Sequence, residues 1–125
     1  MGNVAASGGY YIACNADSIF ANANTITGSI GVFSVIPNFG NFMKNKLGIT
    51  YDAVKTSTYA GTPTTSRALN TAEQKMVQSG VDSTYLTFKT RVAIGRKKSI
   101  AYIDSIAQGR VWTGADALKV GLVDK

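Results

Sequence analysis

The first 43 residues of this chain carry one charged side chain, Asp17, and every other acidic or basic residue follows them. A stretch of this length with a single charge is expected to be buried on most sides or to face a partner. Within it, Ser7 stands between two alanines and two glycines, so no neighbouring side chain is larger than a methyl group. The side chains next to Ser7 in the sequence therefore leave space around its hydroxyl group.

Strands and helices are expected to alternate along the rest of the chain. Apolar and β-branched runs predict strands at residues 18–22, 25–36, 49–56 and 110–112. Helix-start and helix-stop residues predict helices at 7–16, 37–48, 70–92, 99–109 and 113–121, and residues 57–66 read as a loop. This order predicts an α/β fold with short, mainly parallel strands alternating with helices.

The helix expected to begin near residue 70 has the clearest start signal. Asn70 and Thr71 are typical helix starters, and Glu73 and Gln74 are placed for a capping box. Apolar residues then follow at spacings of three or four, which predicts one apolar stripe: Val77, Val81, Tyr85, Phe88 and Val92.

Composition excludes several kinds of chemistry. The chain has 125 residues, enough for one domain or part of one, and no apolar run long enough to span a bilayer. It contains no histidine, which excludes Ser-His-Asp catalysis and most zinc sites within the chain. Cys14 is the one cysteine and is expected to be a small buried filler. The net charge is +6, and the basic residues are scattered between Lys44 and Lys125 without interleaved aromatic residues, which predicts a solvated basic surface and no nucleic-acid partner.

Ser7 allows two interpretations. In a strand-turn-helix nucleophile elbow, the serine lies at a strained turn between small residues, and the N–H of Gly8 would be the first donor to an oxyanion. Alternatively, Ser7 is the N-cap of an ordinary buried helix. A catalytic serine needs a base, and lysine is the leading choice without histidine, but no lysine precedes Lys44.

Three segments of the chain, "MGNVAASGGYYIACNADSIFANANTITGSIGV", "ALNTAEQKMVQ" and "IAQGRVWTGADALKVGLVD", resemble the signal peptide peptidase A family, also called protease IV. The resemblance covers nearly the whole chain. It implies a Clp protease/crotonase-like fold, with residues 1–125 forming the C-terminal, catalytic-serine part of a longer protein. It also implies that Ser7 is the nucleophile, that Gly8 contributes an oxyanion N–H, and that Ser29 helps to hold the catalytic lysine. Without the resemblance, Ser29 reads as a turn serine.

The chain departs from the family at the base. In short, single-repeat members the dyad lysine aligns with position 60, and this chain has Ala60 there. Double-length members supply the lysine from their N-terminal half, so we expect both the lysine and the second oxyanion donor upstream. Lys55 is the nearest substitute within the chain.

The resemblance implies a serine endopeptidase that hydrolyses cleaved signal peptides and other extended apolar peptides through a Ser-Lys dyad. A non-catalytic scaffolding or binding module of the same fold is the alternative. No cofactor and no metal are expected. The expected partners are the peptide substrate and further copies of the parent protein in a homo-oligomer. The resemblance also implies association with the bacterial cell membrane through segments absent from this chain, with the catalytic domain on the extracytoplasmic side.

Overall fold

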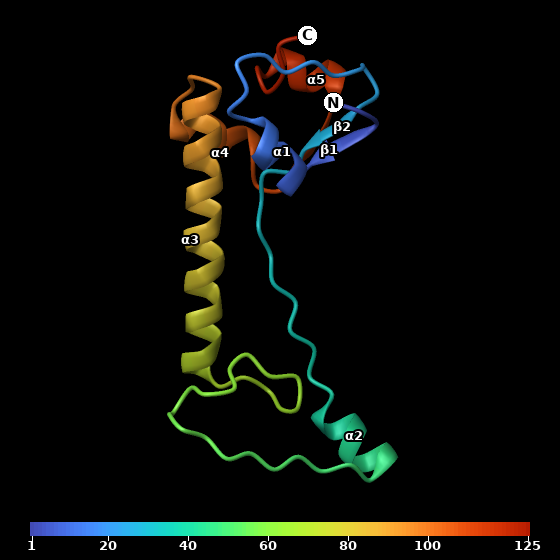
Figure 1. Cartoon of the computed structure of the whole chain (residues 1–125), viewed down its shortest axis with the longest axis vertical. Coiled ribbons are helices and arrows are strands. Elements are labelled where there is room, and N and C mark those ends of the chain that lie inside the picture. The colour runs from blue at the N-terminus through green and yellow to red at the C-terminus, as the bar shows by residue number, and fades with distance from the viewer. The chain divides into compact units, whose positions relative to one another are not determined.

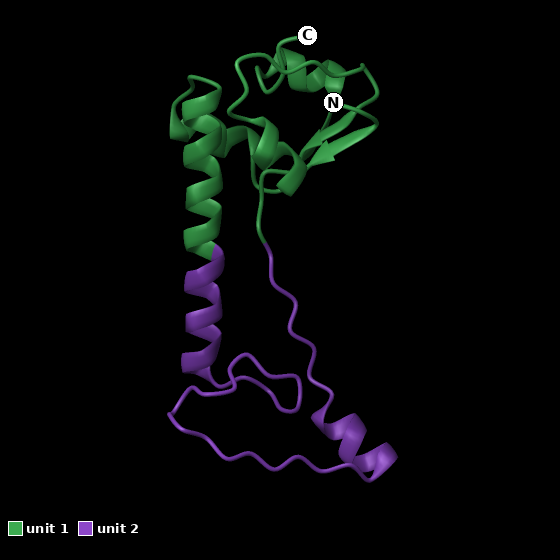
Figure 2. Cartoon of the chain, in the orientation of Figure 1, with its two compact units in different colours: residues 1–32, 82–125 green, residues 33–81 purple.

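The computed structural model describes all 125 residues, which form three short strands and five helices (Figure 1). In chain order these are β1 (Val4–Ala6), α1 (Gly8–Ala13), β2 (Ile26–Gly28), α2 (Gly40–Leu47), α3 (Thr71–Gly95), α4 (Ile100–Ile106), β3 (Val111–Thr113) and α5 (Gly114–Lys119). The chain divides into two compact units, one made of residues 1–32 and 82–125 and the other of residues 33–81 (Figure 2). None of the helices combines the length and the apolar character needed to cross a membrane.

All three strands belong to the first unit and form one sheet in the order β1-β2-β3. β1 pairs with β2 in parallel, with Ala6 opposite Gly28, and β2 pairs with β3 in antiparallel orientation. The α/β class is therefore as predicted, but the sheet is mixed rather than mainly parallel. Because β1 and β2 run in the same direction, their carboxyl ends lie at one edge of the sheet, and Ser7 and Ser29 directly follow those ends.

The core of the first unit joins residues from both ends of the chain. Tyr10 of α1, Val92 of α3, Ile103 of α4 and Leu122 are all completely buried. The Tyr10 hydroxyl donates a 2.7 Å hydrogen bond to the Leu122 carbonyl oxygen, and burial raises the pKa of this phenol. Cys14 is also fully buried, as predicted. This core packs α1 against the C-terminal segment and so supports the turn that precedes α1.

The predicted capping box is confirmed. The Asn70 side-chain oxygen accepts from the Glu73 N–H at 2.9 Å, and the Glu73 carboxylate accepts from the Asn70 N–H at 2.8 Å. At α5, Thr113 accepts from the Asp116 N–H as a helix cap, which agrees with the predicted start. The stripe on α3 is buried at Phe88 and Val92 and only half-buried at its earlier positions.

Several predicted strands are wrong. Residues 18–22 and 49–56 form no ladder, and the predicted strand at 25–36 is a strand only at Ile26–Gly28. It ends because Gly28 and Ser29 adopt positive φ angles of 71° and 50°, which turn the chain away from the sheet. Val54 is exposed, so no partner strand covers residues 49–56. The predicted helix at 37–48 begins only at Gly40 and ends before Gly48.

Candidate active site

Ser7 lies between the last residue of β1 and the first residue of α1. Its backbone has φ 51° and ψ −118°, a conformation that non-glycine residues rarely adopt and that typically costs about 1–3 kcal/mol. Two hydrogen bonds hold it there: the Ser7 N–H donates to the Gly28 carbonyl at 2.9 Å, and the Ser7 carbonyl accepts from the Tyr11 N–H at 2.8 Å. The strained turn between a strand and a helix is therefore present.

The structure does not support the reading of Ser7 as an ordinary helix cap. Ser7 occupies the N-cap position, but its side chain makes no capping hydrogen bond and its backbone is outside the extended region usual for caps. By contrast, Ser99 and Thr113, at the starts of α4 and α5, are extended and accept the expected backbone N–H bonds. The Ser7 residue is exposed, so its hydroxyl is accessible to a ligand.

The glycines after Ser7 leave open space at the turn. A Cβ atom built on Gly8 would meet nothing within 4 Å, and one on Gly9 would only touch the Ala5 Cβ at 4.0 Å. Within this chain the glycines are therefore not required by packing. As the first residue of α1, Gly8 has an N–H with no acceptor inside the helix, and it lies directly after the Ser7 hydroxyl.

Ser29 occupies the equivalent place at the end of the neighbouring strand. Since Ala6 pairs with Gly28, Ser7 and Ser29 directly follow the paired last residues of two neighbouring strands, and such strands lie about 4.8 Å apart. Ser29 has a positive φ of 50°, is half-buried, and donates its N–H to the Arg110 carbonyl at 2.7 Å. The two serines singled out by the sequence thus both follow strand ends at one edge of the sheet, each at a positive φ.

No lysine amine bonds to the hydroxyl of either serine. In the first unit, Lys89 pairs with Asp104 at 2.6 Å and Lys119 with Asp116 at 2.8 Å. Lys55 and position 60 belong to the other unit, 33–81. Burial raises the pKa of the Cys14 thiol, which keeps it protonated and makes it a poor rival nucleophile.

One polar cluster was missed by reasoning from sequence. In the unit 33–81, Glu73 is 1% exposed and accepts two guanidinium N–H bonds from Arg67, at 2.6 and 2.7 Å, and one hydroxyl bond from Thr62 at 2.6 Å. The Arg67 and Thr62 hydrogen bonds, together with the Asn70 N–H, hold the pKa of the Glu73 carboxyl well below its usual range. The capping box pointed to Glu73, but no local pattern pointed to Arg67 or Thr62.

Comparison with known proteins places this α/β chain, with its serine at a strand-helix turn, among the peptidases. Residues 1–125 match the profile of Peptidase family S49, so the chain belongs to that family. It is 45% identical over 125 residues to "Protease 4" of Haemophilus influenzae and 46% identical over 124 residues to "Protease 4" of Salmonella typhi, and each match covers 99–100% of this chain and 20% of the relative. It is also 35% identical to "Serine protease SPPA, chloroplastic" of Arabidopsis thaliana. That match covers 99% of this chain and 18% of the relative. The chain thus spans about a fifth of the Protease 4 relatives, and the predicted resemblance is confirmed.

Proposed function

We propose that the intact protein is a serine endopeptidase of the signal peptide peptidase A type, which hydrolyses cleaved signal peptides and other extended apolar peptides. The observation that carries this proposal is the exposed Ser7, uncapped and held at positive φ between a strand and a helix, in a chain of a peptidase family. Backbone strain of this kind is concentrated at functional sites, where it fixes the direction of a reactive group.

The reaction proceeds by acyl transfer to Ser7. The Ser7 oxygen attacks the peptide carbonyl carbon while a neutral lysine from outside this chain accepts the hydroxyl proton. The Gly8 N–H donates to the oxygen that gains negative charge. The C–N bond then breaks, the leaving amine takes the proton from the lysine, and water hydrolyses the resulting ester to release the acid and restore Ser7.

Ser29 positions the base in this scheme. Its place at the carboxyl edge of the sheet, on the strand next to the one that leads to Ser7, allows its hydroxyl oxygen to accept a hydrogen bond from an N–H of the neutral lysine amine. Such a bond fixes the direction of the amine and leaves its single lone pair free to take the Ser7 proton. Ser29 therefore acts through the lysine, and it does not touch the peptide.

The proposal extends to the whole protein. We place the fold in the Clp protease/crotonase-like group and the dyad lysine and second oxyanion donor upstream of this chain. The parent protein forms a homo-oligomer and is associated with the bacterial membrane, its catalytic domain on the extracytoplasmic side. Sedimentation of the intact protein tests the oligomer, and a monomer across the micromolar range would contradict it.

A non-catalytic module is the second candidate, because no lysine bonds to Ser7 within this chain and position 60 is alanine. The two candidates differ in the reactivity of Ser7. In the intact protein, Ser7→Ala should abolish cleavage of an apolar reporter peptide, because loss of the nucleophile removes the covalent path. Ser18→Ala, at another exposed serine, is the matched control and should leave cleavage unchanged. Cleavage that survives Ser7→Ala would exclude Ser7 as the nucleophile.

A further inference from the structure

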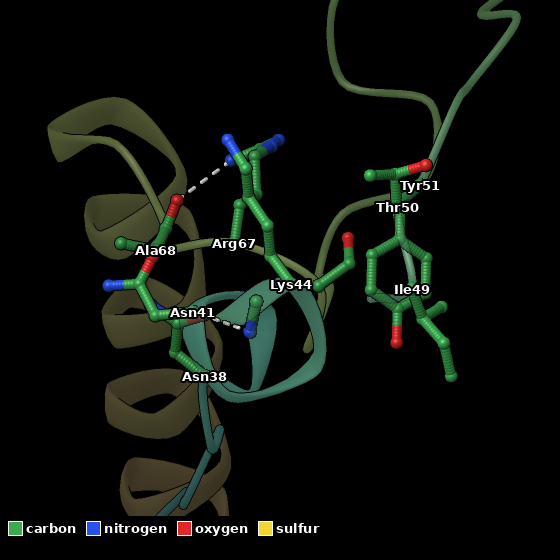
Figure 3. Close-up of a pocket in the computed structure, with 10 residues that line it drawn as sticks. Asn38, Asn41, Lys44, Ile49, Thr50, Tyr51, Arg67 and Ala68 are labelled. Atoms are coloured by element: carbon green, nitrogen blue, oxygen red, sulfur yellow. Dashed lines mark hydrogen bonds between the residues drawn. The ribbon is translucent and has the colours of Figure 1, made fainter. Parts of the chain in front are cut away.

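The unit 33–81 contains a hollow of about 450 Å³, within the usual range of small-molecule sites. It lies against α2 and the segments 49–51 and 66–68 (Figure 3). The polar groups that line it include the ammonium of Lys44, the guanidinium of Arg67 and the amides of Asn38 and Asn41. No acidic residue lines it.

Arg67 has hydrogen-bonding capacity left for a ligand. Its Nη1 donates to the Ala68 carbonyl at 3.0 Å and to Glu73 at 2.7 Å, and its Nη2 donates once to Glu73 at 2.6 Å. A guanidinium has five N–H donors, so the Nε–H and the second Nη2 hydrogen remain. These two lie on the same side of the group and form a fork that matches the two oxygens of a carboxylate. Because Glu73 holds Nη1 and Nη2 at the other end of the guanidinium, the direction of the Nε–H and of the remaining Nη2 hydrogen is fixed.

The charges around the hollow suit a single negative charge. Glu73 offsets the charge of Arg67, and it already accepts further bonds from Thr62 and the Asn70 N–H. Lys44 has no ion-pair partner, so the surplus beside the hollow is one positive charge. A carboxylate balances this charge, whereas a phosphate dianion would exceed it.

Part of the remaining wall is apolar, beside the hydroxyl groups of Thr50 and Ser66. Ile49 and Tyr51 line the hollow and are 47% and 55% exposed, so apolar surface lies beside the cationic groups. A second hollow of about 280 Å³ shares Ser66 and Arg67 with the first and again has no acidic residue in its lining. A ligand with an acid at one end and an apolar side chain next to it fits this combination.

We propose that this hollow binds the C-terminal carboxylate of a peptide whose last residue is apolar, with Arg67 and Lys44 on the carboxylate and Ile49 and Tyr51 on the side chain. The choice of a peptide rests on the proposed peptidase function. The carboxylate site itself rests on the lining residues and is tested without any cleavage.

The test uses two small probes that differ only in the acid group, N-acetyl-L-leucine and N-acetyl-L-leucinamide, titrated into the intact protein by calorimetry or NMR. The acid should bind about tenfold more tightly, because a hydrogen bond to a charged group is commonly worth at least one factor of ten in affinity. Lys44→Gln should remove most of this preference. Lys46→Gln is the matched control, since Lys46 is on the same helix and carries the same charge but does not line the hollow.

Equal binding of the acid and the amide would overturn the proposal. It would also be overturned if Lys44→Gln and Lys46→Gln reduced the preference for the acid by the same factor. Inorganic phosphate that binds as tightly as the acid, with the same dependence on Lys44, would also overturn it. A preserved preference for the acid in a protein that shows no Ser7-dependent cleavage would support the carboxylate site while contradicting the proposed peptidase function.

Discussion

Gly28→Ala is expected to be strongly destabilising, because Gly28 combines two requirements at the end of β2. Its φ is 71°, and a Cβ built there would lie 2.6 Å from Cδ1 of Trp112 and 3.3 Å from the Arg110 carbonyl oxygen. Alanine in the left-handed region costs about 1–2 kcal/mol. The indole must also move, which endangers its 3.0 Å hydrogen bond to the Ile106 carbonyl, worth about 1 kcal/mol.

We therefore expect Gly28→Ala to lower the free energy of unfolding by about 2–4 kcal/mol, which is large for a single substitution. Gly109→Ala is the matched control: Gly109 lies in the same unit and has φ 75°, but a Cβ there meets nothing within 4 Å. It should show only the backbone cost of about 1–2 kcal/mol. Urea unfolding followed by tryptophan fluorescence measures both. If Gly28→Ala costs no more than Gly109→Ala, the steric argument at Trp112 is refuted.

Three further predictions concern single side chains. Because the folded state holds the pKa of Glu73 below its usual range, its carboxylate stabilises the fold fully above about pH 4.3, and this contribution is lost as the pH falls from there toward the lower folded value. Glu73→Gln should remove that part of the pH dependence in urea titrations at pH 3–6, and an unchanged slope would contradict it. Ser29→Ala in the intact enzyme should lower kcat more than it raises KM and should shift the limb of the pH–rate profile on which the rate rises with pH, because this limb reports deprotonation of the lysine; superimposable profiles would remove Ser29 from the mechanism. Cys14 should react with a thiol reagent only after unfolding, because it is fully buried, and rapid labelling of the folded protein would contradict its place in the core.

The structural features that the sequence predicted correctly depend on residues that are close together in the chain. The capping box of Asn70 and Glu73 involves residues three positions apart, and the structure contains both of its hydrogen bonds. The α/β class and the turn at Ser7 were likewise predictable, because a serine among small residues at the start of a helix is a local pattern. The catalytic roles of Ser7, Gly8 and Ser29 stay predictions.

Features that depend on distant partners could not be read in this way. Residues 49–56 alternate as a strand does, but a strand also needs a neighbour to accept its hydrogen bonds, and no other strand pairs with them. The antiparallel pairing of β2 with β3 depends on residues more than eighty positions apart. Arg67 looked like one of many scattered surface cations, although its partner Glu73 is buried.

The division of the first unit into residues 1–32 and 82–125 has a consequence for the synthesis of the protein. β1, Ser7 and α1 leave the ribosome before the rest of the unit, and the Leu122 carbonyl that bonds to Tyr10 is synthesised 112 residues later. At translation rates of about 5–20 residues per second, this delay lasts roughly 6–22 s. During that time the apolar side of α1 has no C-terminal segment to cover it. The nascent chain therefore exposes the surroundings of Ser7 to chaperones, and to other nascent chains, for much longer than a unit built from one continuous segment would.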